Sequence, residues 1–187
     1  MTRRPLVVEG VVAVLGKTHA AAGACAAAFV LQATGAPPDA YPLGLAIGAL
    51  AALLPDIDEP HSTVSQHAVI IGPSIGRAVR HRTITHSLVA VVGLVILLRG
   101  LWPTIPPPIL YAAAAGFASH LLTDALTPAG AMLFWPVSPV MVTFTGWLPG
   151  PLAGVFATGG VLETHVFRPL FVAGAAWFAA RGAGLWS

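Results

Sequence analysis

Long apolar runs, separated by proline and glycine, set the hydrophobic pattern of this chain. The most continuous runs are residues 20–33, 88–102 and 109–122. With their flanks they approach the ~20 mainly apolar residues that a helix needs to cross a bilayer. We therefore predict an all-α, polytopic membrane helix bundle, with a very Ala-rich soluble bundle as the alternative. The expected transmembrane helices, about five, are residues 18–34, 41–54, 86–102, 107–124 and 160–180.

Proline marks the expected ends of these spans. Pro55 ends the second span, and a proline cluster around Pro106 marks the turn between the third and fourth. Residues 128–158 carry Trp135 and Trp147 among many prolines and glycines, so we predict an interfacial loop with both indoles at headgroup depth. Residues 1–187 are expected to form a single integral membrane domain.

Charged residues make up only 9% of the chain, and their positions predict its orientation. Lys and Arg are enriched on the cytoplasmic side of membrane proteins. We therefore predict a multi-pass protein of a bacterial-type inner membrane with a cytoplasmic N-terminus. No basic stripe indicates a nucleic-acid partner, and no pattern indicates an oligomeric state. The cationic residues used here are Arg3, Arg4 and Lys17 before the first span, and Arg77, Arg80 and Arg82 before the third.

Potential metal ligands gather at the cytoplasmic ends of four predicted segments. Carboxylates and imidazoles are costly in apolar surroundings unless they are paired or bind a metal. Their concentration at one membrane face predicts a His/Asp metal cluster open to the cytoplasm. The seven candidate ligands are His19, Asp56, Asp58, His81, His86, His120 and Asp124.

Taken singly, these motifs are ambiguous. His120 and Asp124 share a helix face at i, i+4, which also fits a local hydrogen bond. Asp56 and Asp58 follow Pro55 in a turn that could equally be a solvated loop. The case for a cluster therefore depends on the convergence of all segments at one depth.

Two further histidines belong to the seven candidate ligands, whereas the other polar residues are weaker candidates. His81 and His86 are expected to straddle a helix start, with Thr83 or Thr85 near the cap. Glu163 fits either a catalytic carboxylate or a partner that orients a ligating histidine. Outside the cluster we place His61 and His67, which lie in a polar loop, and His165, which is expected to pack or hydrogen-bond within the last span.

The ligand types narrow the choice of metal. Imidazole with carboxylate suits zinc, manganese or iron, and the absence of thiolates argues against a structural zinc knot. Seven ligands exceed one tetrahedral site, so we expect two divalent ions, with zinc favoured. Two such ions roughly 3.5–4 Å apart can activate water and stabilise a phosphoryl displacement.

Four sequence segments between residues 16 and 136 carry the candidate ligands within longer motifs. They are GKTHAAAGA at 16–24, LLPDIDEPHSTVSQ at 53–66, HRTITHS at 81–87 and GFASHLLTDALTPAGAMLFWP at 116–136. These segments resemble the YdjM-like, or LexA-regulated, family of membrane-bound metal-dependent hydrolases. The region 137–187 matches poorly apart from ATGGVLE at 157–163.

The resemblance implies a chemistry. The family's ligand pattern is similar to that of zinc-dependent phospholipase C and the P1-type nucleases, whose HxxxD helix is matched by His120 and Asp124. It implies phosphoester hydrolysis with the seven candidates as ligands or base. Those trinuclear enzymes also use a free N-terminal Trp as a ligand, which this chain lacks, so a third metal is in doubt.

We therefore predict a membrane-embedded hydrolase that cleaves a phosphoester of a membrane lipid from the cytoplasmic leaflet. Asp58 or Asp56 would position or deprotonate the attacking water. Arg82 would hold the substrate phosphate, unless it only sets the topology. The alternatives are a metal transporter or sensor, a structural membrane protein with a metal staple, and a hydrolase of another bond.

Overall fold

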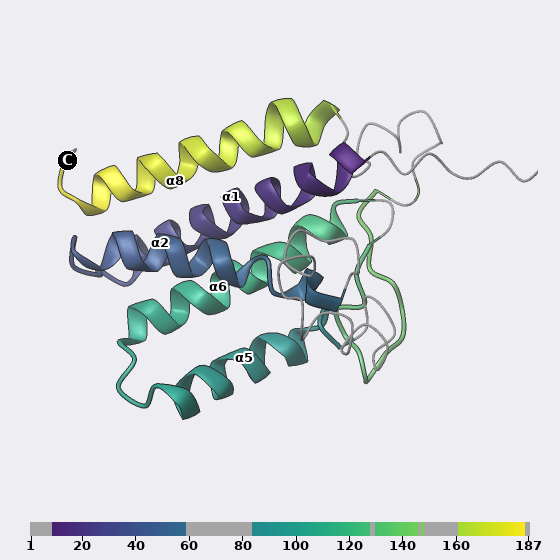
Figure 1. The fold of residues 1–187 in the computed structure, drawn as a ribbon, viewed down its shortest axis with the longest axis horizontal. Helices are drawn as coiled ribbons and strands as arrows, with labels where there is room; N and C mark the ends of the chain where they lie inside the picture. The colour runs from purple at the N-terminus through teal and green to yellow at the C-terminus, as the bar shows by residue number, and fades with distance from the viewer. Residues whose placement is uncertain (1–8, 59–83, 128–129, 146, 148–160, 186–187) are drawn as a thin grey trace, which may run out of the picture.

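The computed structural model shows a helical bundle (Figure 1), with five α-helices among the residues that it describes. It describes residues 9–58, 84–127, 130–145, 147 and 161–185, with side chains from residue 16 onward and without that of Asp58. The α-helices are α1 (Glu9–Ala33), α2 (Ala40–Ala51), α5 (Leu88–Leu101), α6 (Pro107–Ala125) and α8 (Arg168–Gly182). A 3-10 helix, η1 (Pro55–Asp58), follows α2, and a π-helix, η2 (Glu163–Phe167), precedes α8.

The all-helical prediction is confirmed, since the described residues contain no strand beyond one isolated β-bridge between Ala131 and Val142. Each of the five α-helices occupies the place of a predicted span. The boundaries differ most at α1, which begins at Glu9, and at the last span, where the π-helix and α8 join.

None of the described helices has both the length and the apolar character needed for a membrane crossing.

Helix α1 lies at the centre of the bundle. It packs against α2, α6 and α8, while α2 also packs against α6, and α5 packs against α6 (Figure 1). The side chains of Ala27 and Leu31 in α1 are fully buried, and Leu31 lies against Gly44 of α2. The bundle therefore brings α1, α2 and α6 together as its best-packed unit.

Three glycines set the close approach of these helices. A methyl group on Gly23 of α1 or on Gly116 of α6 would overlap the backbone of Gly48 in α2. Gly23 lies one turn from His19, and Gly116 lies one turn from His120. Backbone contact at the glycines therefore fixes how the neighbouring imidazoles approach one another.

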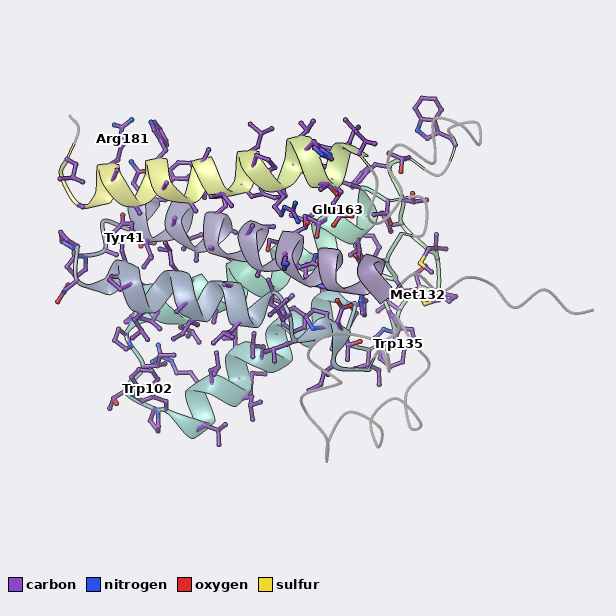
Figure 2. The ribbon with its side chains drawn as sticks, turned by 45° about the horizontal axis from the view of Figure 1, so that its top comes forward. Tyr41, Trp102, Met132, Trp135, Glu163 and Arg181 are labelled. Carbon is purple, nitrogen blue, oxygen red and sulfur yellow. The ribbon has the colours of Figure 1, made fainter. Side chains whose placement is uncertain are left out.

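The two ends of the bundle differ in chemistry. Figure 2 shows Tyr41, Trp102 and Arg181 at one end, and Glu163 and Trp135 at the other. At the Glu163 end, α6 stops with unsatisfied carbonyl groups, as helices do. The segment 130–145 satisfies several of them. The Phe144 amide donates to the carbonyl oxygen of Ala125, and the Thr145 hydroxyl donates to the carbonyl oxygen of Leu126, both at 2.8 Å.

Candidate metal centre

Imidazoles and carboxylates from four segments meet at the Glu163 end of the bundle. His19 comes from α1, and Asp56 comes from the 3-10 helix after α2. His86 precedes the N-cap of α5, and His120 and Asp124 lie one turn apart on α6. Among the described residues, two groups of side chains could each hold a metal ion. These are His19 with His120 and Asp124, and Asp56 with His86 and His120.

The spacing of the second group matches a coordination shell. Nε2 of His86 lies 3.6 Å from Asp56 Oδ1, 3.4 Å from Asp124 Oδ2 and 3.3 Å from His120 Nε2. Nε2 of His120 lies 3.5 Å from each of the same carboxylate oxygens. A tetrahedral zinc ion with bonds of about 2.0–2.1 Å separates its ligand atoms by roughly 3.3–3.4 Å. Charge-assisted hydrogen bonds are shorter, at about 2.7–2.9 Å.

The outer nitrogen of His120 is occupied by the backbone. Its Nδ1 lies 2.8 Å from the carbonyl oxygen of Ala52, which can only accept a hydrogen bond. Nδ1 therefore carries a proton, and in the neutral form of the ring the Nε2 lone pair points to the carboxylates. Metal-binding histidines are commonly fixed in this way by a carbonyl or carboxylate behind them.

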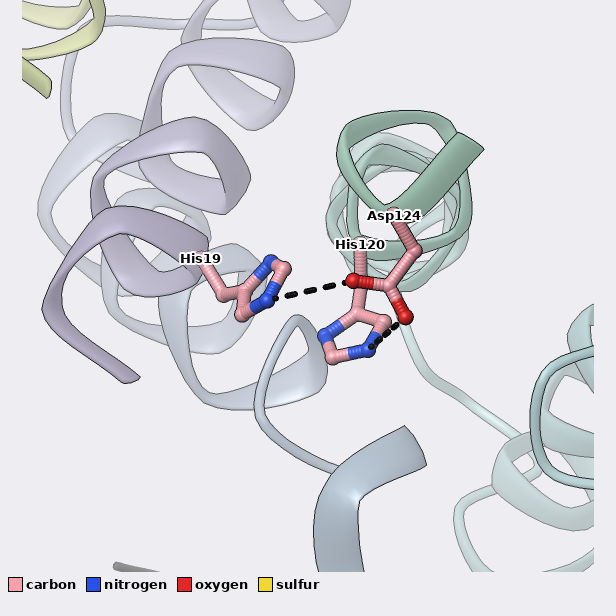
Figure 3. Close-up of side chains that lie close together, drawn as sticks. All are labelled: His19, His120 and Asp124. Atoms are coloured by element: carbon pink, nitrogen blue, oxygen red, sulfur yellow. Dashed lines mark ion pairs between the residues drawn. The ribbon is translucent and has the colours of Figure 1, made fainter. Parts of the chain in front are cut away.

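A threonine fixes His19 in the same manner. The Thr123 hydroxyl donates to the carbonyl groups of Ser119 or His120, 3.0 and 2.9 Å away. The same hydroxyl lies 2.8 Å from Nδ1 of His19 and so fixes the orientation of this imidazole. Nε2 of His19 then faces Asp124 Oδ1 at 3.5 Å, as Figure 3 shows.

With both imidazoles neutral and protonated on Nδ1, the Nε2 lone pairs of His19 and His120 face the negative oxygens of Asp124 across a buried space. His120 is fully buried, and the exposed fractions of His19 and Asp124 are 4% and 5%. Such an arrangement is repulsive unless a cation lies between the groups. A single proton could relieve one contact, whereas a divalent ion relieves several at once. The donor set therefore fits a divalent metal.

Asp124 has the geometry of a bridge between two ions. Its Oδ1 faces His19, and its Oδ2 faces His86 and His120. The rings of His19 and His120 stack with centroids 3.9 Å apart. Because Nδ1 of His120 is engaged, its Nε2 can serve only one ion. A second ion would therefore depend on His19, on Asp124 Oδ1 and on a further ligand.

A small cavity lies on the His19 side of this centre. Its volume is about 30 Å³, enough for water, which needs roughly 10–15 Å³. Glu163 and Phe167, both from the π-helix, line the cavity together with His19 and Asp124. Single π-helical turns often occur at functional sites. Glu163 and the candidate ligand His19 therefore line the same cavity.

Asp56 is the carboxylate of the centre that is most open to the surroundings, with 20% of its side chain exposed against 7% for Asp124. Burial alone would raise the pKa of Asp56, but the neighbouring imidazoles of His86, His120 and His19 hold that pKa below its usual value. Asp56 is therefore ionised at neutral pH.

The structure brings together five of the seven candidate ligands, namely His19, Asp56, His86, His120 and Asp124. Asp58 ends the 3-10 helix, but its side chain lies outside the described residues, as do His81 and Arg82. These three assignments stay predictions. His61 and His67 also lie outside the described residues. His165 is exposed, and its Nδ1 lies 3.3 Å from the Val161 carbonyl oxygen, apart from the cluster.

Sequence reasoning missed the groups that orient the imidazoles. Thr123 and the Ala52 carbonyl carry no motif of their own, although a threonine between two ligands of an apolar helix was a usable signal. The cap residue itself was also not identified, although Thr85 lies near it. The N-cap of α5 is Ser87, whose hydroxyl accepts from the Ala90 amide, while Thr85 contacts Nδ1 of His86 at 3.0 Å.

Replacing Thr123 with valine should weaken metal binding without removing a ligand. The change keeps the side-chain shape but leaves Nδ1 of His19 without its hydrogen-bond partner, and losing such partners costs about 10–100-fold in metal affinity. Competition with a zinc chelator would measure this. Thr34→Val is the matched control, because Thr34 makes the same bonds to helix carbonyls with no histidine beside it. Equal affinities for the two variants would contradict the assignment.

Comparison with known proteins places the chain in a family. The family model described as "YdjM inner membrane protein" matches residues 14–185. The chain is 44% identical over 90 residues to "Inner membrane protein YdjM" of Escherichia coli (strain K12) and, equally, of Shigella flexneri. These alignments cover 46% of this chain and 46% of each relative, so the chain spans about half the length of these curated relatives.

A third relative is more distant but is covered further. "Uncharacterized protein YvsG" of Bacillus subtilis (strain 168) is 31% identical over 121 residues, which is 65% of this chain and 72% of that protein. No solved structure matches the chain significantly. Because the family model covers nearly the whole chain, this protein belongs to the YdjM inner membrane protein family.

Proposed function

We propose that this protein is an inner-membrane, metal-dependent hydrolase that cleaves a phosphoester bond of a lipid. The observation that carries the proposal is the convergence of His86, His120, Asp56 and Asp124 at spacings of 3.3–3.6 Å, with the outer nitrogen of His120 already engaged. The nature of the donor set favours zinc, with manganese or iron as alternatives.

The ligands suggest a division of roles. His86, His120 and Asp56 would hold one ion, while His19 and Asp124 Oδ1 would contribute to a second. Bound divalent ions supply Lewis acidity and make water a better nucleophile near neutral pH. Asp56, as the more exposed and ionised carboxylate, would orient that water and accept its proton. Glu163 lines the cavity on the other side of His19 and would be a further catalytic carboxylate.

Two observations support a membrane location. Two relatives are named inner membrane proteins. In addition, α5 has no buried residue and exposes a row of large apolar side chains, which in a water-soluble monomer would be an unusual patch. We propose that the helices lie in the bilayer with the metal centre at its cytoplasmic face. The exposed apolar residues of α5 are Leu88, Val89, Val92, Ile96, Leu97 and Leu101.

The decisive experiment combines elemental analysis with an activity assay. Full-length protein purified gently in detergent should contain about two divalent ions, as the ligand count of a two-metal site suggests. It should release a phosphorylated headgroup or phosphate from phospholipid, lose that activity in EDTA and regain it with zinc or manganese. Protein without bound metal that also fails to bind added ions would overturn the proposal.

The alternatives give different results in the same preparation. Tightly bound metal without turnover on any phosphoester would indicate a structural metal staple. Metal uptake into sealed vesicles that depends on His120 would indicate a transporter. Either result would replace the hydrolase assignment.

A further inference from the structure

An apolar groove runs along the outside of the bundle between α1, α6 and α8. Its volume is about 340 Å³, at the lower end of the ~300–1,000 Å³ typical of ligand pockets. Most side chains along it are apolar, including Ala22, Ala26 and Phe29 of α1 and Phe178 of α8, with the hydroxyl groups of Ser119 and Thr123 on the α6 side. None of the described residues that line it is charged. Its chemistry therefore suits a hydrocarbon better than a charged headgroup.

The groove leads to the metal centre. Thr123, Leu126 and Phe171 line both the groove and the small cavity that contains His19, Asp124 and Glu163. The two spaces are therefore neighbours, one apolar and one carrying metal ligands. An apolar groove that ends at a polar cavity matches a lipid molecule, which has a hydrocarbon chain and a polar headgroup.

The far end of the groove is bounded by an aromatic pair. Phe29 and Phe178 contact edge to face, with centroids 5.4 Å apart. Phe29 lies ten residues beyond His19 along α1, which corresponds to about 15 Å of helix. The groove therefore has room for one extended chain segment, with its polar end at the metal ligands.

We infer that this groove holds one hydrocarbon chain of a membrane phospholipid whose phosphoester group lies at the metal centre. The inference rests on the proposed function, because it takes the metal centre as the place of the headgroup. Entry would be lateral, from the bilayer, since the groove is formed on the outside of α1, α6 and α8. Binding of the hydrocarbon chain in the groove would then hold the phosphoester beside Asp124 and Glu163.

Cys25 provides a test that does not depend on activity. It lines the groove and is the only cysteine of the chain. In detergent, its modification by a maleimide should slow roughly tenfold when a long-chain phospholipid is present at about ten times its Kd. Glycerophosphate, which has the headgroup chemistry without the chain, should give no protection. The control is the Cys25→Ser, Ala176→Cys protein, whose thiol lies on an exposed part of α8 and should react at the same rate with or without lipid.

A variant that fills the groove provides the second test. Ala26→Trp should lower kcat/KM for a long-chain phospholipid at least about tenfold, the effect of losing contact with two buried methylenes. Metal content and hydrolysis of a short, water-soluble phosphoester should stay unchanged, which also shows that the variant is folded. Ala176→Trp adds the same side chain to the exposed face of α8 and should change none of these quantities.

The outcomes separate this inference from the function on which it rests. Cys25 that reacts equally with and without phospholipid, in a protein that hydrolyses lipid, would overturn the groove assignment and leave the hydrolase standing. Lipid-dependent protection of Cys25 in a metal-loaded protein without turnover would support the groove and overturn the hydrolase. If Ala26→Trp loses activity on both substrates together with its metal, the Cys25 measurement on the unaltered protein decides.

Discussion

Replacing Asp124 with asparagine is expected to remove the bound metal and, with it, all metal-dependent activity. The carboxylate faces His19 through Oδ1 and faces His86 and His120 through Oδ2, so a single substitution affects both sides of the centre. Removing a partner behind a ligand already costs about 10–100-fold in metal affinity, so losing this charge should cost at least about 100-fold. The shape of the side chain is nearly unchanged.

Elemental analysis and thermal unfolding together measure this effect. A ligand that binds only the folded state raises the melting temperature as its concentration rises. Added zinc should therefore raise the melting temperature of the wild-type protein and leave that of Asp124→Asn unchanged. Asp39→Asn is the matched control, because Asp39 is an exposed carboxylate at the start of α2 without a side-chain capping bond. Zinc stabilisation of Asp124→Asn equal to that of Asp39→Asn would refute the metal centre.

Hydrophobic pattern alone predicted where the helices lie. Apolar runs bounded by proline indicate helices whatever their partners are, and α6 begins at Pro107 within the predicted span. The pattern does not specify which helices pack against one another. That α5 packs against α6 while α1 lies at the centre is decided by side-chain shape across helices, which no local window records.

The candidate ligands were predictable because they are chemically out of place in an apolar chain. Their common depth was predicted from the expected topology, and this is why Asp56 could be placed beside histidines far away in the sequence. The supporting groups have no such contrast. The Ala52 carbonyl is backbone, and the Thr123 hydroxyl could equally have bonded only to its own helix, as that of Thr34 does.

Replacing Gly116 with alanine should destabilise the protein and impair its metal centre, although the added methyl group touches none of the candidate ligands. The added methyl group would overlap the backbone of Gly48, which cannot move aside as a flexible side chain could. Overpacking of this kind costs about 1–3 kcal/mol in the free energy of unfolding. Helices α2 and α6 must separate, and the Ala52 carbonyl, one turn beyond Gly48, then moves away from Nδ1 of His120. Metal affinity should fall together with stability.

Gly93→Ala is the matched control, the same substitution on α5 at a position with room for the methyl group. A methyl group there meets no atom within 4 Å, and the position is exposed and helical. Alanine is favoured over glycine in a helix by about 0.5–1 kcal/mol, so this variant should be slightly more stable and bind metal normally. Chemical unfolding and chelator competition on both variants measure the two quantities. Unchanged metal affinity in a destabilised Gly116→Ala protein would show that the glycine contact supports the bundle without positioning His120.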